Sequence, residues 1–156
     1  MLQYKIQFSW IGLIIFALPM LINIVYFVFP PVNAPSEAEA SNKIWEMIEQ
    51  VTRVLYVAAI CILVSNKKTD FKSPWFYLGI VFLILYYIVW IRYFMGGRDV
   101  ALLGKSFLFV PMPLAVFPVL YFFFSAIWLH NYIAAIIMVV FGITHNLVSY
   151  ASFGKY

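Results

Sequence analysis

The residues best suited to chemistry lie in a short charged segment of an otherwise apolar chain. Glu46, Glu49 and Arg53 are spaced i, i+3 and i+7, so a helix would place them on one face, with Glu49 able to pair with Arg53 one turn on. Only about 11 uncharged residues follow Arg53, roughly 16 Å of helix, which is half of a bilayer's hydrocarbon core. A helix that spans a bilayer here must therefore carry its charges into the membrane.

Other polar residues are predicted to lie at a similar depth. Counting about 1.5 Å per residue along alternating helices places all of them in one leaflet. An isolated ion at such a depth costs several kcal/mol, so ionisable groups there normally face the bundle interior and pair. We therefore predict one polar, partly hydrated binding pocket, open to one membrane surface and formed by Asn23, Glu46, Glu49, Arg53, Arg92, His145 and Asn146.

Structural roles are the alternatives for the same residues. Glu46 and Arg92 are near enough to helix ends to reach the membrane surface with their long side chains. Glu49 and Arg53 would then form a purely structural ion pair, and the His145-Asn146 pair would bond neighbouring helices.

The composition predicts a membrane protein. Of 156 residues, 65% are hydrophobic, 21% aromatic and only 10% charged, whereas about a quarter of the residues are charged in soluble domains. The net charge is +4, but the basic residues are scattered over predicted helix ends, which favours contact with anionic lipid head groups and argues against nucleic acid. The single cysteine, Cys61, lies in an apolar run and offers neither a disulfide nor a cysteine-rich metal motif.

Five hydrophobic segments are long enough to cross a bilayer as helices. They predict an all-α integral membrane protein, a single domain of residues 1–156 in which five transmembrane helices and short loops occupy about residues 8–29, 36–65, 75–95, 107–129 and 132–150. Ser36 and Glu39 have the spacing of a capping box, and the Pro111-Met112-Pro113 turn marks an irregular point in the fourth segment. The tryptophans all fall near predicted helix ends, as an interfacial belt requires: Trp10, Trp45, Trp75, Trp90 and Trp128.

The loops indicate an orientation and a compartment. The basic loop at residues 67–72 is predicted to be cytoplasmic, with the N-terminus inside and the C-terminus outside. Compact size and short loops indicate a bacterial inner membrane.

Several kinds of site are absent from the sequence. It contains no HExxH, CxxC, glycine-rich phosphate loop or GxSxG motif, and Arg53 beside the glutamates would oppose a cation. We therefore expect no metal and no cofactor.

Two family resemblances concern the site and the architecture. Phe141-Gly-Ile-Thr-His145 resembles the histidine motif of CAAX-type intramembrane proteases, and Glu49 with Arg53 resembles part of that family's glutamate motif. This resemblance covers few residues, the family's paired glutamates are missing, and no adequate Phe-to-Arg motif surrounds Arg92. In size and helix count the chain is also similar to the tryptophan-rich sensory proteins, five-helix binders of porphyrins and sterols, but it lacks their Trp- and Pro-rich signature.

Three functions remain open at this point. The preferred one is a non-enzymatic protein that binds or transports a small amphipathic or lipid-like molecule, with its head at the charged residues and its body among aromatic, proline-bent helices. The alternative is a small intramembrane hydrolase or transferase that uses Glu49 as base and His145 as its partner. A further alternative is an accessory subunit, or a homo-oligomer, that packs against other membrane chains.

Overall fold

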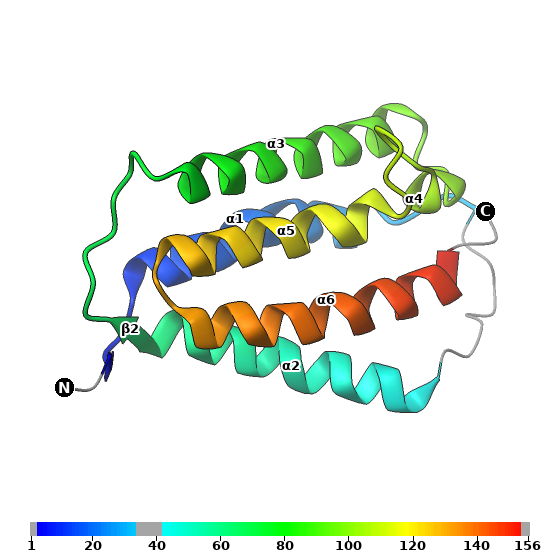
Figure 1. Cartoon of the computed structure of the whole chain (residues 1–156). Coiled ribbons are helices and arrows are strands. Elements are labelled where there is room, and N and C mark those ends of the chain that lie inside the picture. Colours follow the sequence, from blue (N-terminus) through cyan, green and yellow to red (C-terminus); the bar gives the residue numbers. More distant parts are fainter. Residues whose placement is uncertain (1–2, 34–41, 154–156) are drawn as a thin grey trace.

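The chain is mostly helical. The computed structural model describes residues 3–33 and 42–153, which contain six helices and one short β-ribbon (Figure 1). In chain order the elements are β1 (Tyr4–Ile6), α1 (Trp10–Val28), α2 (Lys43–Ile62), β2 (Leu63–Ser65), α3 (Pro74–Met95), α4 (Ala101–Gly104), α5 (Pro113–Trp128) and α6 (Tyr132–Phe153). Helix α4 has only four residues, and the other five helices have 16 to 22.

Local signals set the helix starts. The Ser9 hydroxyl accepts a 3.0 Å hydrogen bond from the Gly12 N–H at the start of α1, and the Asn42 side chain accepts one of 2.9 Å from Ile44 at the start of α2. The predicted start of α2 near Ser36 lies outside the described residues. Helix α3 begins at Pro74, a residue whose missing N–H is no loss in a first turn.

The predicted fourth segment began too early. Helix α5 begins at Pro113, whereas the sequence pattern indicated residue 107. Two prolines, Pro111 and Pro113, cannot donate backbone hydrogen bonds, and Met112 between them has a φ of +50°, so a helix cannot continue through this turn. The irregular point expected at these prolines is therefore the helix boundary itself.

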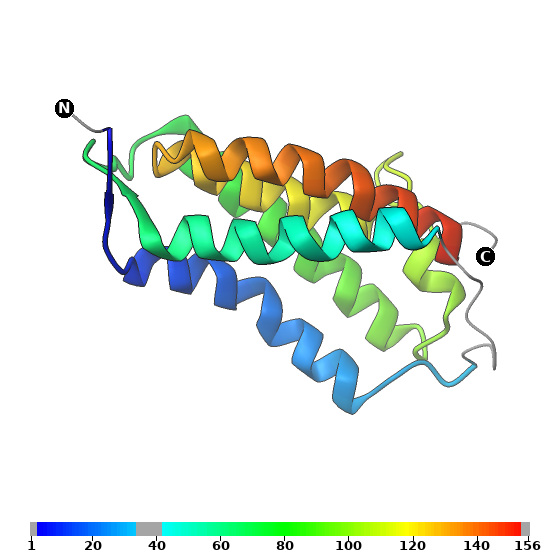
Figure 2. The ribbon, with the colours of Figure 1, turned by 90° about the horizontal axis from the view of Figure 1, so that it is seen from below.

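Four helices form a layer, and the fifth long helix lies on one face of it. The layer order is α2, α6, α5 and α3, with extensive packing between each neighbouring pair (Figure 1). Helix α1 lies across this layer and packs less extensively against α2, α3 and α5. Figure 2 shows α1 close to α2 at the β-ribbon end and diverging from it toward the other end.

Contacts at both ends fix the slant of α1. Near the ribbon, Gly12 approaches the α2 backbone so closely that a Cβ there would lie 2.0 Å from the carbonyl oxygen of Ile60. Toward the other end, the Tyr86 hydroxyl of α3 donates a 2.7 Å hydrogen bond to Asn23 of α1. Helix α1 therefore touches α2 at its start and α3 further along.

The β-ribbon corrects the all-α prediction. Residues 63–65, expected to end the second helix, form β2 and pair antiparallel with β1. The buried Asn131 side chain donates hydrogen bonds of 2.9 Å to the carbonyl of Ala59, which also accepts the Leu63 N–H at the end of α2, and 2.8 Å to that of Leu63, the first residue of β2. The strand can therefore begin directly after the helix.

Two tryptophans, Trp90 and Trp128, depart from the expected interfacial belt because both are buried. Trp90 is buried in the core, with its ring centroid 5.2 Å from that of Tyr26 and 5.5 Å from that of Tyr93. Its place in the sequence, five residues before the end of α3, does not reveal that it faces α1.

Three of the described helices, α1, α3 and α6, are long and apolar enough to cross a bilayer. Helix α5 is equally apolar in character but has only 16 residues, and α2 carries the charged segment.

Two glycine substitutions test how α1 is seated. Alanine normally stabilises a helix relative to glycine by about 1 kcal/mol. We expect Gly12→Ala to do the reverse and lower the free energy of unfolding by about 1–3 kcal/mol, because the new methyl group forces α1 away from the Ile60 carbonyl. Thermal unfolding in detergent micelles, followed by circular dichroism, measures the change.

Gly79→Ala is the matched control. Its Cβ would have Ser125 Oγ at 3.4 Å as its nearest neighbour, an ordinary contact, so unchanged or increased stability is expected. Equal effects of the two substitutions would contradict the close approach of α1 and α2.

Candidate functional site

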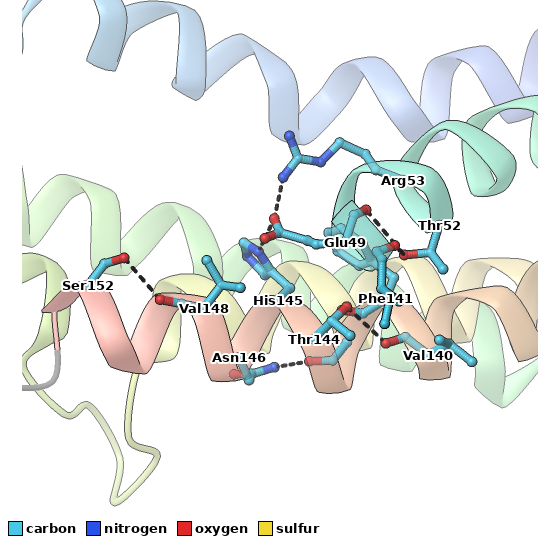
Figure 3. Close-up of polar contacts among 12 residues, drawn as sticks. Glu49, Thr52, Arg53, Val140, Phe141, Thr144, His145, Asn146, Val148 and Ser152 are labelled. Carbon is cyan, nitrogen blue, oxygen red and sulfur yellow. Dashed lines mark hydrogen bonds and ion pairs between the residues drawn. The ribbon is translucent and has the colours of Figure 1, made fainter. Parts of the chain in front are cut away.

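Glu49 is the centre of the site. It lies on the face of α2 that packs against α6, and only 6% of its surface is exposed. Its Oε1 atom forms an ion pair with Arg53 one turn on and also contacts His145 Nδ1 of α6 at 3.0 Å. Figure 3 shows the carboxylate between these two side chains. The structure therefore joins three of the predicted site residues around one oxygen atom.

The phenyl ring of Phe141 packs against both partners of Glu49, His145 and Arg53. Phe141, one turn before His145, stacks on the imidazole with the ring centroids 5.0 Å apart and an angle of 13° between the planes. The Arg53 Cζ atom lies 5.8 Å from the centroid of the same phenyl ring. Phe141 thereby restricts the orientations of both the imidazole and the guanidinium group.

The geometry fixes the tautomer of a neutral His145. A carboxylate only accepts hydrogen bonds, so the Nδ1 atom beside Glu49 must carry the proton. The second ring nitrogen, Nε2, is then the one that can accept a proton or a hydrogen bond. The site thus combines a buried anion, a permanent cation and a group that can gain a positive charge.

A cavity of about 730 Å³ adjoins this cluster. Its walls come from α1 and α2, which diverge here, and its floor comes from α5 and α6. Most of the lining is apolar, and the polar side chains in it are Asn23, Arg53, Tyr56, Tyr86 and His145. Among the described residues that line it none is acidic, because Glu49 lies behind Arg53 and His145.

Asn23 is the fourth predicted residue at this site. It lines the cavity from α1, and its Oδ1 accepts the hydrogen bond from Tyr86. Its amide nitrogen lies 3.8 Å from the sulfur of Met20, another lining residue.

Three predicted residues lie elsewhere. Arg92 donates hydrogen bonds of 3.0 Å to the Ser106 carbonyl and 2.7 Å to the Lys105 carbonyl, so it binds the connection after α4. Asn146 donates a 2.7 Å hydrogen bond to the Gly142 carbonyl of its own helix. Glu46 is exposed one turn before Glu49 and is not part of the cavity lining.

Sequence reasoning missed two polar members of the lining. Tyr56 is buried and donates a 2.8 Å hydrogen bond to the Phe122 carbonyl, and Tyr86 is bonded to Asn23. A tyrosine in the middle of an apolar segment is a usable signal, because a buried hydroxyl group needs a partner.

No group of three His, Cys, Asp or Glu side chains in the described part of the chain is placed to hold a metal ion. No family model, no curated protein and no solved structure matches this chain.

A double-mutant cycle tests the coupling of the ion pair. Arg53→Met should lower the free energy of unfolding by about 1–3 kcal/mol, because it leaves the buried Glu49 carboxylate with one partner fewer. Glu49→Gln should cost less, since the Arg53 side chain is 47% exposed and can turn outward. Unfolding by sodium dodecyl sulfate in mixed micelles gives these values.

The double variant Glu49→Gln/Arg53→Met should recover most of the loss seen for Arg53→Met alone, because no unpaired buried charge remains. Strictly additive effects of the two substitutions would show that the pair is not coupled.

Proposed function

We propose that the protein is an integral membrane protein that crosses the bilayer five times, through α1, α2, α3, α5 and α6. The three long apolar helices support this, and so do the outward faces. On α1 more than half of each of four large apolar side chains is exposed, at Ile14, Leu21, Ile24 and Phe27. Soluble proteins rarely present such a surface. Helix α5 is about 24 Å long, most of a hydrocarbon core of roughly 30 Å.

The proposed setting is a bacterial inner membrane, with the β-ribbon end in the cytoplasm. That end carries Lys5 on β1 and the basic loop after β2, which contains Lys67, Lys68 and Lys72. The opposite end also carries basic residues, at Lys43, Arg98 and Lys105, so the assignment rests on the clustering of lysines in one short loop, which is typical of the cytoplasmic face.

Labelling of single cysteines tests this topology. In a Cys61→Ala background, Lys68→Cys should react with a membrane-impermeant maleimide only from the cytoplasmic side. Lys105→Cys, in the connection between α4 and α5, should react only from the opposite side. Labelling of both positions from one side would contradict an odd number of crossings between them.

Within this setting, we propose that the cavity binds a small amphipathic or lipid-like molecule. The main support for this proposal is a cavity of about 730 Å³ whose wall is mostly apolar and is polar around Arg53 and His145. Binding sites for small molecules have this volume and this combination of surfaces. The polar head would lie at Arg53, His145 and Asn23, and the apolar body against Phe122 and Met138.

A lateral entrance is part of the proposal. Val54 and Ile62 of α2 line the cavity and are also 67% and 46% exposed, so they form its rim beside α1. In a bilayer this rim would face lipid tails, and the ligand would enter sideways. Membrane lipids are therefore the expected source of the ligand.

Two tryptophan substitutions test the cavity. Ala58 lines it and is exposed, so Ala58→Trp should fill the space without disturbing the core. Leu55→Trp places the same side chain on α2 at a half-exposed position outside the lining. Purification in mild detergent and native mass spectrometry should detect a bound small molecule in the wild type and in Leu55→Trp. At least a tenfold lower occupancy is expected in Ala58→Trp.

The proposal would be refuted by equal occupancy in Ala58→Trp and Leu55→Trp, or by the lack of any bound molecule in the wild type. Circular dichroism of both variants shows whether the helical content is retained.

The 3.0 Å contact between Glu49 and His145 favours a second candidate, an intramembrane hydrolase with Glu49 as base. The same mass spectra separate the two functions. A binding protein retains the same molecule in the wild type and in Glu49→Gln, whereas a hydrolase accumulates a larger, uncleaved molecule only in Glu49→Gln. The burial of Glu49 behind the cavity wall supports binding as the primary function.

A further inference from the structure

The cavity presents positive charge and hydrogen-bond donors to whatever it holds. Arg53 is the permanent cation in its lining, His145 is a potential cation, and the Asn23 amide adds a donor. The carboxylate of Glu49 lies behind the first two and is 6% exposed. A bound molecule therefore meets cations and donors before it meets the buried anion, which favours an anionic head group.

Glu49 has two partners, so it can lose one of them and still be paired. Arg53 and His145 both contact the same Oε1 atom, so Glu49 keeps a hydrogen bond to His145 when the guanidinium group turns toward a ligand. The Arg53 side chain is 47% exposed and reaches the cavity, which leaves room for that turn.

Charge balance then requires a proton. With His145 neutral, Glu49 and Arg53 cancel, and an added anion would give the site a net charge of −1. An uncompensated charge in a low-dielectric site costs several kcal/mol, whereas a proton on His145 restores neutrality. His145 is at the right place, since its Nδ1 atom lies 3.0 Å from the Glu49 carboxylate and the ring lines the cavity.

We infer that the cavity binds an anionic amphiphile with a single alkyl chain together with one proton, with the anion on Arg53 and the proton on His145. This inference rests on the proposed function and names its ligand class. A volume of about 730 Å³ suits one alkyl chain better than a two-chain phospholipid, because it is that of a drug-sized ligand. The proton comes from a hydronium ion of the solvent as the ligand enters: one O–H bond of the hydronium ion breaks, an N–H bond forms on His145, and a water molecule is left.

Other titratable groups do not supply this proton near neutral pH. On α2 the lining contains Tyr56 and Cys61, on α3 it contains Tyr86, and from α1 and α5 it contains no titratable side chain among the described residues. Tyrosine and cysteine are neutral at pH 7 and do not become cations. Glu46, outside the lining, is the remaining acidic group on the same face of α2.

The test measures affinity against pH with a probe whose own charge is constant. Tritiated N-lauroyltaurine carries a sulfonate at every pH used, and its binding to the full-length protein in dodecyl maltoside micelles is read by scintillation proximity. We expect the affinity to be highest at the acidic end of the pH range, because one proton binds with the probe. As the pH rises, the affinity falls by up to about tenfold per pH unit, the limit for one linked proton.

Three variants give different signatures. His145→Gln should bind the probe with a flat pH profile, at the low affinity that the wild type shows at high pH. Arg53→Met should weaken binding at least about tenfold at all pH values. Glu49→Gln should instead tighten binding at pH 8 by about tenfold or more and remove the pH dependence, because Arg53 is freed and no proton is then needed for neutrality.

Glu49→Gln is the decisive variant, since a purely structural role of the carboxylate predicts unchanged or weaker binding. A wild-type affinity that is independent of pH would overturn the inference. A pH slope that persists in His145→Gln would do the same.

Competitors separate this inference from the proposed function. Monolauroylglycerol is neutral and dodecyltrimethylammonium is cationic, and both should displace the sulfonate at least tenfold less effectively than unlabelled N-lauroyltaurine. If they displace it equally well while Ala58→Trp abolishes binding, the lipid-binding cavity stands and its anion selectivity is refuted. If Ala58→Trp binds the sulfonate like the wild type, both proposals fail.

Discussion

The burial of one carboxylate constrains the rest of the site. Glu49 is almost inaccessible in the contact between α2 and α6, where an ionised group is stable only with partners of opposite charge or with hydrogen-bond donors. Arg53 meets this need from the same helix, and His145 meets it from the neighbouring one. The pairing therefore fixes the register of α6 against α2 and brings the one titratable imidazole of this region to the cavity wall.

Helix α1 supplies one wall of the cavity that lies beside this cluster. Its start is pressed against α2 at Gly12, and its later part is bonded to α3 through Asn23, so it crosses the layer at a slant. Helices α1 and α2 diverge away from the ribbon end (Figure 2), and residues of both helices, Arg53 among them, line the cavity. The same slant exposes the apolar rim at Val54 and Ile62. A polar group and an apolar wall in one cavity follow from this geometry, and the proposed binding of an amphipathic molecule needs both.

Sequence patterns predicted part of this arrangement. The apolar segments predicted the long helices, and the i, i+4 spacing predicted the Glu49–Arg53 pair. Estimated depth brought His145 to the height of Glu49, but depth says nothing about the direction in which a side chain leaves its helix. Arg92 and Asn146 therefore fell into the predicted pocket, although nearby backbone carbonyls bind both. The β2 strand was missed because Leu63 and Val64 continue the apolar run of α2 without a breaking residue.

Infrared difference spectroscopy on the protein in lipid bilayers tests the central claim most directly. The claim is that Glu49 stays ionised inside the bundle because Arg53 and His145 hold it. The spectrum of the wild type minus that of Glu49→Gln at neutral pH should contain the stretching bands of an ionised carboxylate. A carbonyl band of a protonated carboxylic acid in their place would contradict the claim, because a neutral Glu49 would need neither partner.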